Sequence, residues 1–278
     1  MIAVRCLLLY TPVICYRLFP QNEILLNHNS GSDIQRIYAP SIVDVPYHVL
    51  IIYDGLFCSG SLISSITVLT AASCFWKYTD DKVFVKAGTN VISNEGYIYQ
   101  VESIKIHEYY KHLSDTDNDI ALLLLKNHVA FNNGVKKVIL LEPETALRVN
   151  TPMIVSGWST MKLSPKYGNV LLWSEMFLID KNECIKSYGR YMTSSNFCAK
   201  YNLERRLYDN GGPATFQDFL VGFASFTSKN HSEPYFAVFT NVSYFYRWIM
   251  LNTKYFLEKR CKENRVSGVD FLDYDYLE

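Results

Sequence analysis

The chain has 278 residues, of which 49% are hydrophobic and 19% are charged. This composition is typical of one large domain or two tightly packed halves with a substantial core, and it excludes a disordered chain. The 27 basic and 27 acidic residues balance to zero net charge, so the charge does not indicate binding to nucleic acid or to an anionic membrane.

The N-terminal residues predict a secretory signal peptide over residues 1–20. Arg5 precedes a short apolar run over residues 6–16, which is too short to span a membrane. A buried strand is the alternative interpretation, because a short apolar run fits both. The following residues, 21–35, are polar and loop-like, and no later stretch is long and apolar enough to span a bilayer.

Short runs typical of β-strands, separated by turn residues, follow along most of the chain. They include residues 47–53, 66–70, 83–86, 97–106, 119–125, 152–156, 171–179 and 219–226. This regular spacing predicts an all-β sandwich or a pair of barrels. Residues 243–257 predict a helix, because Phe245, Ile249 and Phe256 follow a spacing near 3.6 residues and Ser243 can serve as the N-cap. Residues 260–278 form an acidic, aromatic tail.

The chain has seven cysteines, of which Cys6 and Cys15 fall in the predicted signal peptide. No Cys-x-x-Cys pair occurs, so the sequence does not support a zinc site, and we expect neither a metal nor a cofactor. Of the other five, Cys261 is left without a neighbouring cysteine. In a secreted chain such a residue either cross-links to a partner or stays free.

Seven segments in the same chain order resemble the trypsin-like serine proteases. They are 36–37, 45–49, 58–63 with 69–74, 119–123, 155–158, 196–199 and 242–249. In addition, Tyr208-Asp209-Asn210-Gly211-Gly212-Pro213 resembles the family's nucleophile segment Gly-Asp-Ser-Gly-Gly-Pro. The resemblance implies two six-stranded antiparallel Greek-key β-barrels with a C-terminal helix over residues 37–259, after a propeptide-like segment over 21–36.

The family's chemistry uses a histidine base, an orienting aspartate, a serine nucleophile and backbone N–H groups that hold the oxyanion. The resemblance places Ser73 where the histidine belongs and Asn210 where the serine belongs, while Asp119 matches the aspartate. A hydroxyl is no general base near pH 7, and a carboxamide is no nucleophile. Tyr208 replaces a glycine that helps aim the oxyanion N–H groups. We therefore expect an inactive homologue in which Asp119 accepts a hydrogen bond from Ser73.

The resemblance also implies two disulfides, one between Cys58 and Cys74 and one between Cys184 and Cys198. A bridge that the family usually has beside the nucleophile segment is missing at both ends. Since that bridge braces the specificity pocket, we expect the pocket to be remodelled.

Glu204 falls at the base of that pocket in the resemblance. It could bind a basic side chain, but an internal pair with Arg205 or Arg206 is favoured, because burying an unpaired carboxylate is costly. In the resemblance, Ser225-Phe226-Thr227 stands where the family has Ser-Trp-Gly, and Phe236-Ala237 stands where it has Pro-Gly. Larger side chains at these small positions of the pocket wall predict a narrowed cleft.

The family is activated by cleavage after a basic residue, and the new amine then pairs with the aspartate before the nucleophile. Arg36-Ile37 and Asp209 retain both ends of that pair, so we treat Arg36 as a candidate processing site. Two glycosylation sequons begin at Asn230 and Asn241, of which Asn230, in a polar loop, is the better candidate.

These features together predict a secreted, non-catalytic protease homologue that binds an extracellular protein as a regulator, cofactor or decoy. The expected partner is a protease, an inhibitor or a protease substrate, and an immune or reproductive fluid fits by analogy. The alternatives are an unorthodox endopeptidase and a ligand-carrying protein. A relocated triad is disfavoured, because no histidine lies beside Cys74.

Overall fold

The computed structural model describes residues 41–75, 82–93, 96–145, 147–158, 170–200, 209–227 and 236–266. It also gives the backbone of four short strands, β1 (Val4–Arg5), β2 (Tyr16–Arg17), β3 (Glu23–Ile24) and β4 (Ile37–Tyr38). β1 pairs with β2, and β4 pairs with β3 and with β13 of the main fold.

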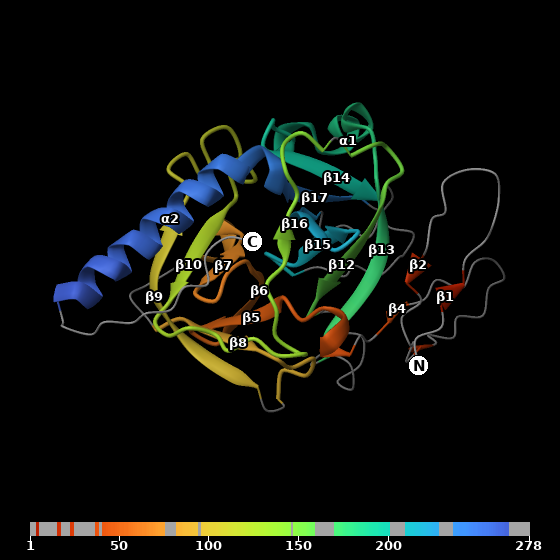
Figure 1. Ribbon diagram of the computed structural model, residues 1–278. Coiled ribbons are helices and arrows are strands. Elements are labelled where there is room, and N and C mark those ends of the chain that lie inside the picture. Colours follow the sequence, from red (N-terminus) through yellow and green to blue (C-terminus); the bar gives the residue numbers. More distant parts are fainter. Residues whose placement is uncertain are drawn as a thin grey trace.

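The first half of the chain forms a closed antiparallel barrel (Figure 1). Its strand order is β10-β7-β6-β5-β8-β9. The strands are β5 (His48–Tyr53), β6 (Leu56–Leu62), β7 (Thr67–Thr70), β8 (Phe84–Ala87), β9 (Tyr97–Ile106) and β10 (Ala121–Leu125). β5 and β6 are joined by a two-residue turn at Asp54-Gly55, where both residues have positive φ, as a tight hairpin requires.

The second half forms the other barrel, with strand order β12-β15-β16-β17-β14-β13, and pairing between β12 and β13 closes it. The strands are β12 (Pro152–Gly157), β13 (Leu172–Leu178), β14 (Asn196–Lys200), β15 (Pro213–Phe216), β16 (Phe219–Thr227) and β17 (Phe236–Asn241). A short strand, β11 (Ile139–Leu140), runs parallel to β16. The predicted pair of six-stranded antiparallel barrels is confirmed.

Each barrel has its own apolar core. Val49, Val68 and Leu122 belong to the core of the first barrel, and Met153 and Phe239 belong to that of the second. Every one of these side chains is at most 1% exposed, because inward-facing residues alternate along each strand and interdigitate with those opposite. Leu220 and Phe223 of β16 belong to the first core, so the two barrels pack directly against each other.

Short helices connect the strands. They are η1 (Ile42–Asp44), η2 (Ala72–Phe75), α1 (Lys181–Tyr188) and η3 (Gly189–Tyr191). α1 was not among the elements predicted from the sequence. It begins after Asp180, whose side chain accepts a hydrogen bond from the Asn182 N–H and so acts as the N-cap.

The C-terminal helix α2 (Val242–Val266) differs from the prediction at both ends. Its N-cap is Asn241 and not Ser243, since the Asn241 Oδ1 accepts from the backbone N–H of Ser243 and of Tyr244. The helix also continues nine residues past Leu257. Phe245 and other apolar side chains of α2 pack into the core of the first barrel, and Figure 1 shows the far end of the helix projecting beyond β9.

Candidate functional site

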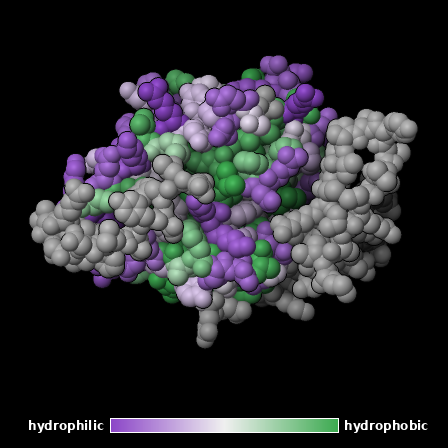
Figure 2. All heavy atoms as spheres, viewed as in Figure 1, coloured by the Kyte–Doolittle hydropathy of each residue, from purple (hydrophilic) through white to green (hydrophobic). Residues whose placement is uncertain are grey.

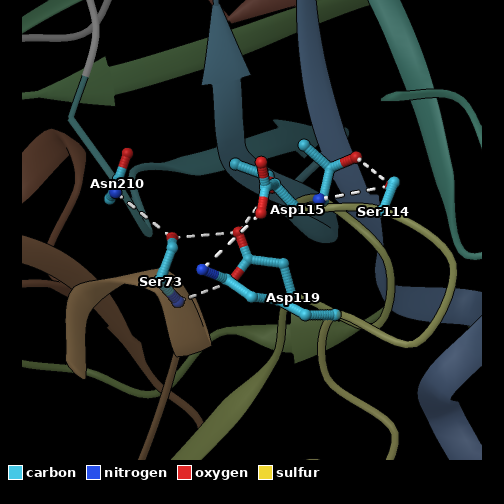
Figure 3. Close-up of polar contacts among 8 residues, drawn as sticks. Ser73, Ser114, Asp115, Asp119 and Asn210 are labelled. Atoms are coloured by element: carbon cyan, nitrogen blue, oxygen red, sulfur yellow. Dashed lines mark hydrogen bonds and ion pairs between the residues drawn. The ribbon is translucent and has the colours of Figure 1, made fainter. Parts of the chain in front are cut away.

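Ser73, Asp119 and Asn210 meet where the two barrels join (Figure 3). Ser73 lies in η2, Asp119 lies two residues before β10, and Asn210 lies in the turn before β15. Ser73 donates to Asp119 twice, from its backbone N–H to Oδ1 at 2.6 Å and from its hydroxyl to Oδ2 at 2.9 Å. The Asn210 Nδ2 donates to the Ser73 hydroxyl at 3.1 Å. The predicted hydrogen bond between Ser73 and Asp119 is therefore present.

Asp119 is held by donors from both barrels. The Ser225 hydroxyl of β16 also donates to Oδ2, and the Thr240 hydroxyl of β17 donates to the Asp119 carbonyl at 2.8 Å. The residue is 1% exposed. This burial raises the pKa of the Asp119 carboxyl from 3.8 to about 6, while the hydrogen bonds from Ser225 and Ser73 oppose the rise.

The hydrogen bonds run in one direction, from the Asn210 amide to the Ser73 hydroxyl and from there to the Asp119 carboxylate. None of the three side chains is an imidazole, so no group here can both take a proton from a hydroxyl and return it near neutral pH. The Ser73 hydroxyl already accepts a hydrogen bond from Asn210, which lowers its capacity to attack. Among the described residues, the buried Asn210 Oδ1 has no hydrogen-bond partner.

The turn that carries Asn210 is fixed by close packing between the barrels. Gly211 has a φ of +82°, and a Cβ there would lie 2.1 Å from the Ser59 carbonyl oxygen, so only glycine fits. The Gly211 N–H donates to the Ala224 carbonyl at 2.8 Å, and the Ser59 N–H donates to the Asn210 carbonyl at 2.9 Å. The backbone of the nucleophile-like segment is thus retained around a side chain of different chemistry.

A second buried polar group lies beside this turn and was not predicted. The His48 Nε2 lies 2.7 Å from the Ser59 hydroxyl, which donates to the Asp209 Oδ2 at 2.6 Å. The His48 Nδ1 lies 2.8 Å from the Ser156 hydroxyl. The backbone N–H of Trp158 donates to the Asp209 Oδ2 at 3.2 Å. Because the Ser59 proton points to Asp209, His48 carries its own proton on Nε2 and accepts from Ser156 at Nδ1.

Burial shifts the pKa values of both ionisable side chains in this network, His48 and Asp209. It lowers the pKa of His48 from 6.5 to about 3, so the imidazole is neutral at physiological pH. It also raises the pKa of Asp209 from 3.8 to about 6, against the hydrogen bonds from Ser59 and Trp158. In the sequence, only its position directly after Val45-Pro46-Tyr47 marks His48, which is the first residue of β5. The network could not be predicted from this, because the partners of His48 lie up to 108 residues away.

A histidine, an aspartate and a serine also occur as His48, Asp117 and Ser195, so their bonding bears on a relocated triad. The Ser195 hydroxyl donates directly to the Asp117 Oδ1 at 3.1 Å. Both ring nitrogens of His48 are engaged by Ser156 and Ser59. The imidazole therefore does not bridge Asp117 and Ser195, as a base that serves a serine nucleophile must.

Aromatic side chains cover the strand segment that follows Ser225. The ring of Tyr191 stacks on that of Phe226 with centroids 4.1 Å apart, and Tyr188 meets Phe226 edge-on at 5.7 Å. The Thr116 hydroxyl donates to the Tyr191 carbonyl and so ties the β9–β10 loop to η3. On the face shown in Figure 2, hydrophobic residues gather above the middle of the view, with hydrophilic residues around them.

Both predicted disulfides are confirmed. Cys58 of β6 bonds to Cys74 of η2, and Cys184 of α1 bonds to Cys198 of β14, each pair with Cα atoms 6.2 Å apart. The first disulfide fixes the segment that carries Ser73. Cys261 is free and exposed on α2.

Other predicted site residues fall outside the described part of the chain. They are Tyr208, Glu204, Arg36 and Asn230. Ile37 is described only through its backbone, in β4. The oxyanion, pocket, processing and glycosylation assignments of these residues therefore stay predictions.

Within the described ranges, no group of three or more His, Cys, Asp or Glu residues is arranged to hold a metal ion. Nor does any helix among the described residues combine the length and apolar character needed to cross a membrane.

The family model described as Trypsin matches residues 34–249. Trypsin zeta of Drosophila melanogaster is 30% identical over 232 residues, which cover 76% of this chain and 82% of that protein. Clotting factor G beta subunit of Tachypleus tridentatus is 29% identical over 216 residues, or 69% of each chain. Transmembrane protease serine 11G of Rattus norvegicus is 28% identical over 255 residues, which cover 60% of that protein.

Two similar solved structures are scabies mite proteins described as inactivated protease paralogues. Paralogue S-D1 gives a TM-score of 0.69 at 25% identity and covers 76% of this chain and 94% of its own. Paralogue S-I1 gives a TM-score of 0.68 at 28% identity and covers 78% of this chain and 98% of its own.

Proposed function

Because the chain belongs to the trypsin family, we propose that it is a secreted, non-catalytic homologue that acts by binding an extracellular protein. The observation that carries this proposal is the hydrogen-bonded series from Asn210 through Ser73 to Asp119. In the proposal, Asn210 occupies the nucleophile position and Ser73 the position of the histidine base. Removal of both groups leaves only weak background rates in proteases of this kind.

The bonding of these residues supports a structural role for the former catalytic positions. Asp119 accepts from Ser73 and Ser225, so its carboxylate is satisfied without an imidazole. The ring of Tyr191 stacks on Phe226, in the strand segment beside the site. The similarity to two proteins described as inactivated paralogues points the same way.

A fluorophosphonate probe tests the catalytic part of the proposal, because only an activated serine attacks its phosphorus and displaces fluoride, which leaves the serine phosphonylated. We expect no labelling of the purified wild-type protein, while active trypsin labels under the same conditions. The matched variant Ser73→Ala shows whether Ser73 is responsible for any signal. Labelling of the wild-type protein that Ser73→Ala removes would overturn the assignment.

Processing at Arg36-Ile37 is a separate part of the proposal. Asp209 would receive the new amine, and its Oδ2 already accepts from Ser59 and Trp158. Exchange of these donors for an amine would move buried groups on both sides of the turn. N-terminal sequencing of the secreted protein decides the point, and a mature N-terminus upstream of Ile37 would exclude cleavage there.

The proposed partner is a protease, an inhibitor or a protease substrate of the extracellular fluid. Capture from that fluid, followed by reconstitution of the pair from purified proteins, tests this. We expect saturable binding by the wild-type protein and by Ser73→Ala alike, because binding does not require catalysis. Failure to recover and reconstitute any protein partner would count against this role.

A further inference from the structure

The helix α2 has an apolar face that the fold leaves uncovered. Its inward residues pack on the first barrel, yet large apolar side chains also lie on the outward face. Tyr244 is 53% exposed, Leu251 58% and Tyr255 61%, and their spacing of seven and four residues places them on one line along the helix. Met250, at 47%, lies beside this line. A row of large exposed apolar side chains along one helix face is typical of a contact site.

Basic side chains flank this apolar line. Arg247, Lys254 and Lys262 are exposed on α2, and the acidic Glu258 pairs weakly with Lys254 at 3.8 Å. Among the described residues, neither Arg247 nor Lys262 has a carboxylate partner. The outward face of α2, defined by these residues and the apolar line, therefore carries a net positive charge.

The residues that follow α2 have the complementary composition. Residues 267–278 include four acidic residues and no lysine or arginine, and half of them are apolar or aromatic. The acidic residues are Asp270, Asp273, Asp275 and Glu278. We propose that residues 267–278 fold back and bind along the outward face of α2, with their aromatic side chains on the apolar line and their carboxylates beside its basic residues.

The length of the segment allows this. Twelve extended residues reach about 40 Å, whereas the helix from Val266 back to Tyr244 spans about 33 Å. Gly268 stands just past the helix end, at the position where a glycine most often lets a chain leave a helix and turn.

Charge and tethering favour this segment over a second copy of the chain as the occupant. Two α2 faces of the same positive sign would repel each other on close approach. The attached acidic segment meets the face at an effective concentration in the millimolar range without any association step. The inference goes beyond the proposed function and does not depend on it.

Hydroxyl-radical footprinting of the full chain against a chain that ends at Val266 tests the proposal. We expect Tyr244 and Tyr255 to react about threefold or more slowly in the full chain, since a tethered segment covers them most of the time. Tyr97, with a matching exposure of 54% but lying on β9, serves as the internal control and should react equally in both. Protection should fall at about 1 M salt, where surface charges are screened within a few ångströms.

A full-length variant shows whether the protection depends on the acidic residues of the segment or only on the presence of a longer chain. Asp270→Asn, Asp273→Asn and Asp275→Asn together should restore the reactivity of the shortened chain. Equal reactivity of Tyr244 and Tyr255 in the full and shortened chains would overturn the proposal. Protection that disappears on dilution in step with a dimer would also overturn it, because a second copy would then cover the face.

Discussion

At the scale of a residue, Asp119 is a buried carboxylate whose hydrogen bonds are satisfied within the protein. Its carboxylate accepts from the Ser73 N–H and the Ser73 hydroxyl in the first half of the chain and from the Ser225 hydroxyl in the second half. A buried carboxylate needs such donors, because each unsatisfied buried group costs about 1–3 kcal/mol or more. Packing and hydrogen bonding therefore account for a buried aspartate at this position without reference to catalysis.

The raised pKa of Asp119 predicts how stability depends on pH. The carboxyl loses its proton near pH 4 when unfolded but near pH 6 when folded, so between these values the native state holds more protons. Its contribution to the free energy of unfolding is therefore present at low pH and is lost as the pH rises through about 6.

Asp119→Asn removes this titration. Between pH 4.5 and 7.5 we expect the free energy of unfolding of wild type to fall relative to that of the variant by an amount on the order of 2 kcal/mol. Urea denaturation at a series of pH values measures the difference. A constant difference between the two proteins across this range would show that the Asp119 pKa is not raised.

At the scale of an element, α2 depends on its N-cap. The Asn241 Oδ1 accepts from the backbone N–H of Ser243 and of Tyr244 and from the Ser243 hydroxyl. We expect Asn241→Ala to lower the free energy of unfolding by about 1 kcal/mol, and Asn241→Asp to change it little, because aspartate keeps the acceptor. Thermal unfolding of protein made without glycosylation measures both, and equal loss in the two variants would contradict the capping role.

The sequence predicted some elements well for definable reasons. Residues 97–106 form β9 within the predicted limits, because a long β-branched and aromatic run has no competing pattern. α1 was missed, because its eight residues are too few to show a helical period in the sequence. Asp180, with Glu183 three residues later, is nevertheless a recognisable helix start. α2 was predicted too short, because its last turns are rich in lysine, glutamate and arginine, which favour helix without marking a core face.

The site was predicted only where the family resemblance supplied positions. The contact of Ser73 with Asp119 followed from two segments of that resemblance and is present. The third donor, Ser225, and the network of His48 with Ser59 and Ser156 join residues that no local pattern connects. Such contacts arise from the packing of one barrel on the other, which periodicity and spacing do not encode.

For the whole molecule, His48 is a polar connection between the barrels. It forms hydrogen bonds with Ser59 in the first barrel and with Ser156 in the second. The Ser59 hydroxyl in turn donates a hydrogen bond to Asp209. We expect His48→Ala to lower the free energy of unfolding by about 2–4 kcal/mol, because it leaves a cavity and unpaired hydroxyls in the interface. His48→Gln, which can keep one hydrogen bond, should cost less. Urea denaturation checks the order, and equal costs would show that packing alone matters.

Peptide hydrolysis tests most directly whether this member of the trypsin family is inactive. The measurement compares a fluorogenic peptide library exposed to purified wild type, Ser73→Ala and Ser195→Ala, so that both described candidate nucleophiles are covered. We predict the same background rate for all three proteins. A wild-type rate above background that either substitution abolishes would contradict the non-catalytic role.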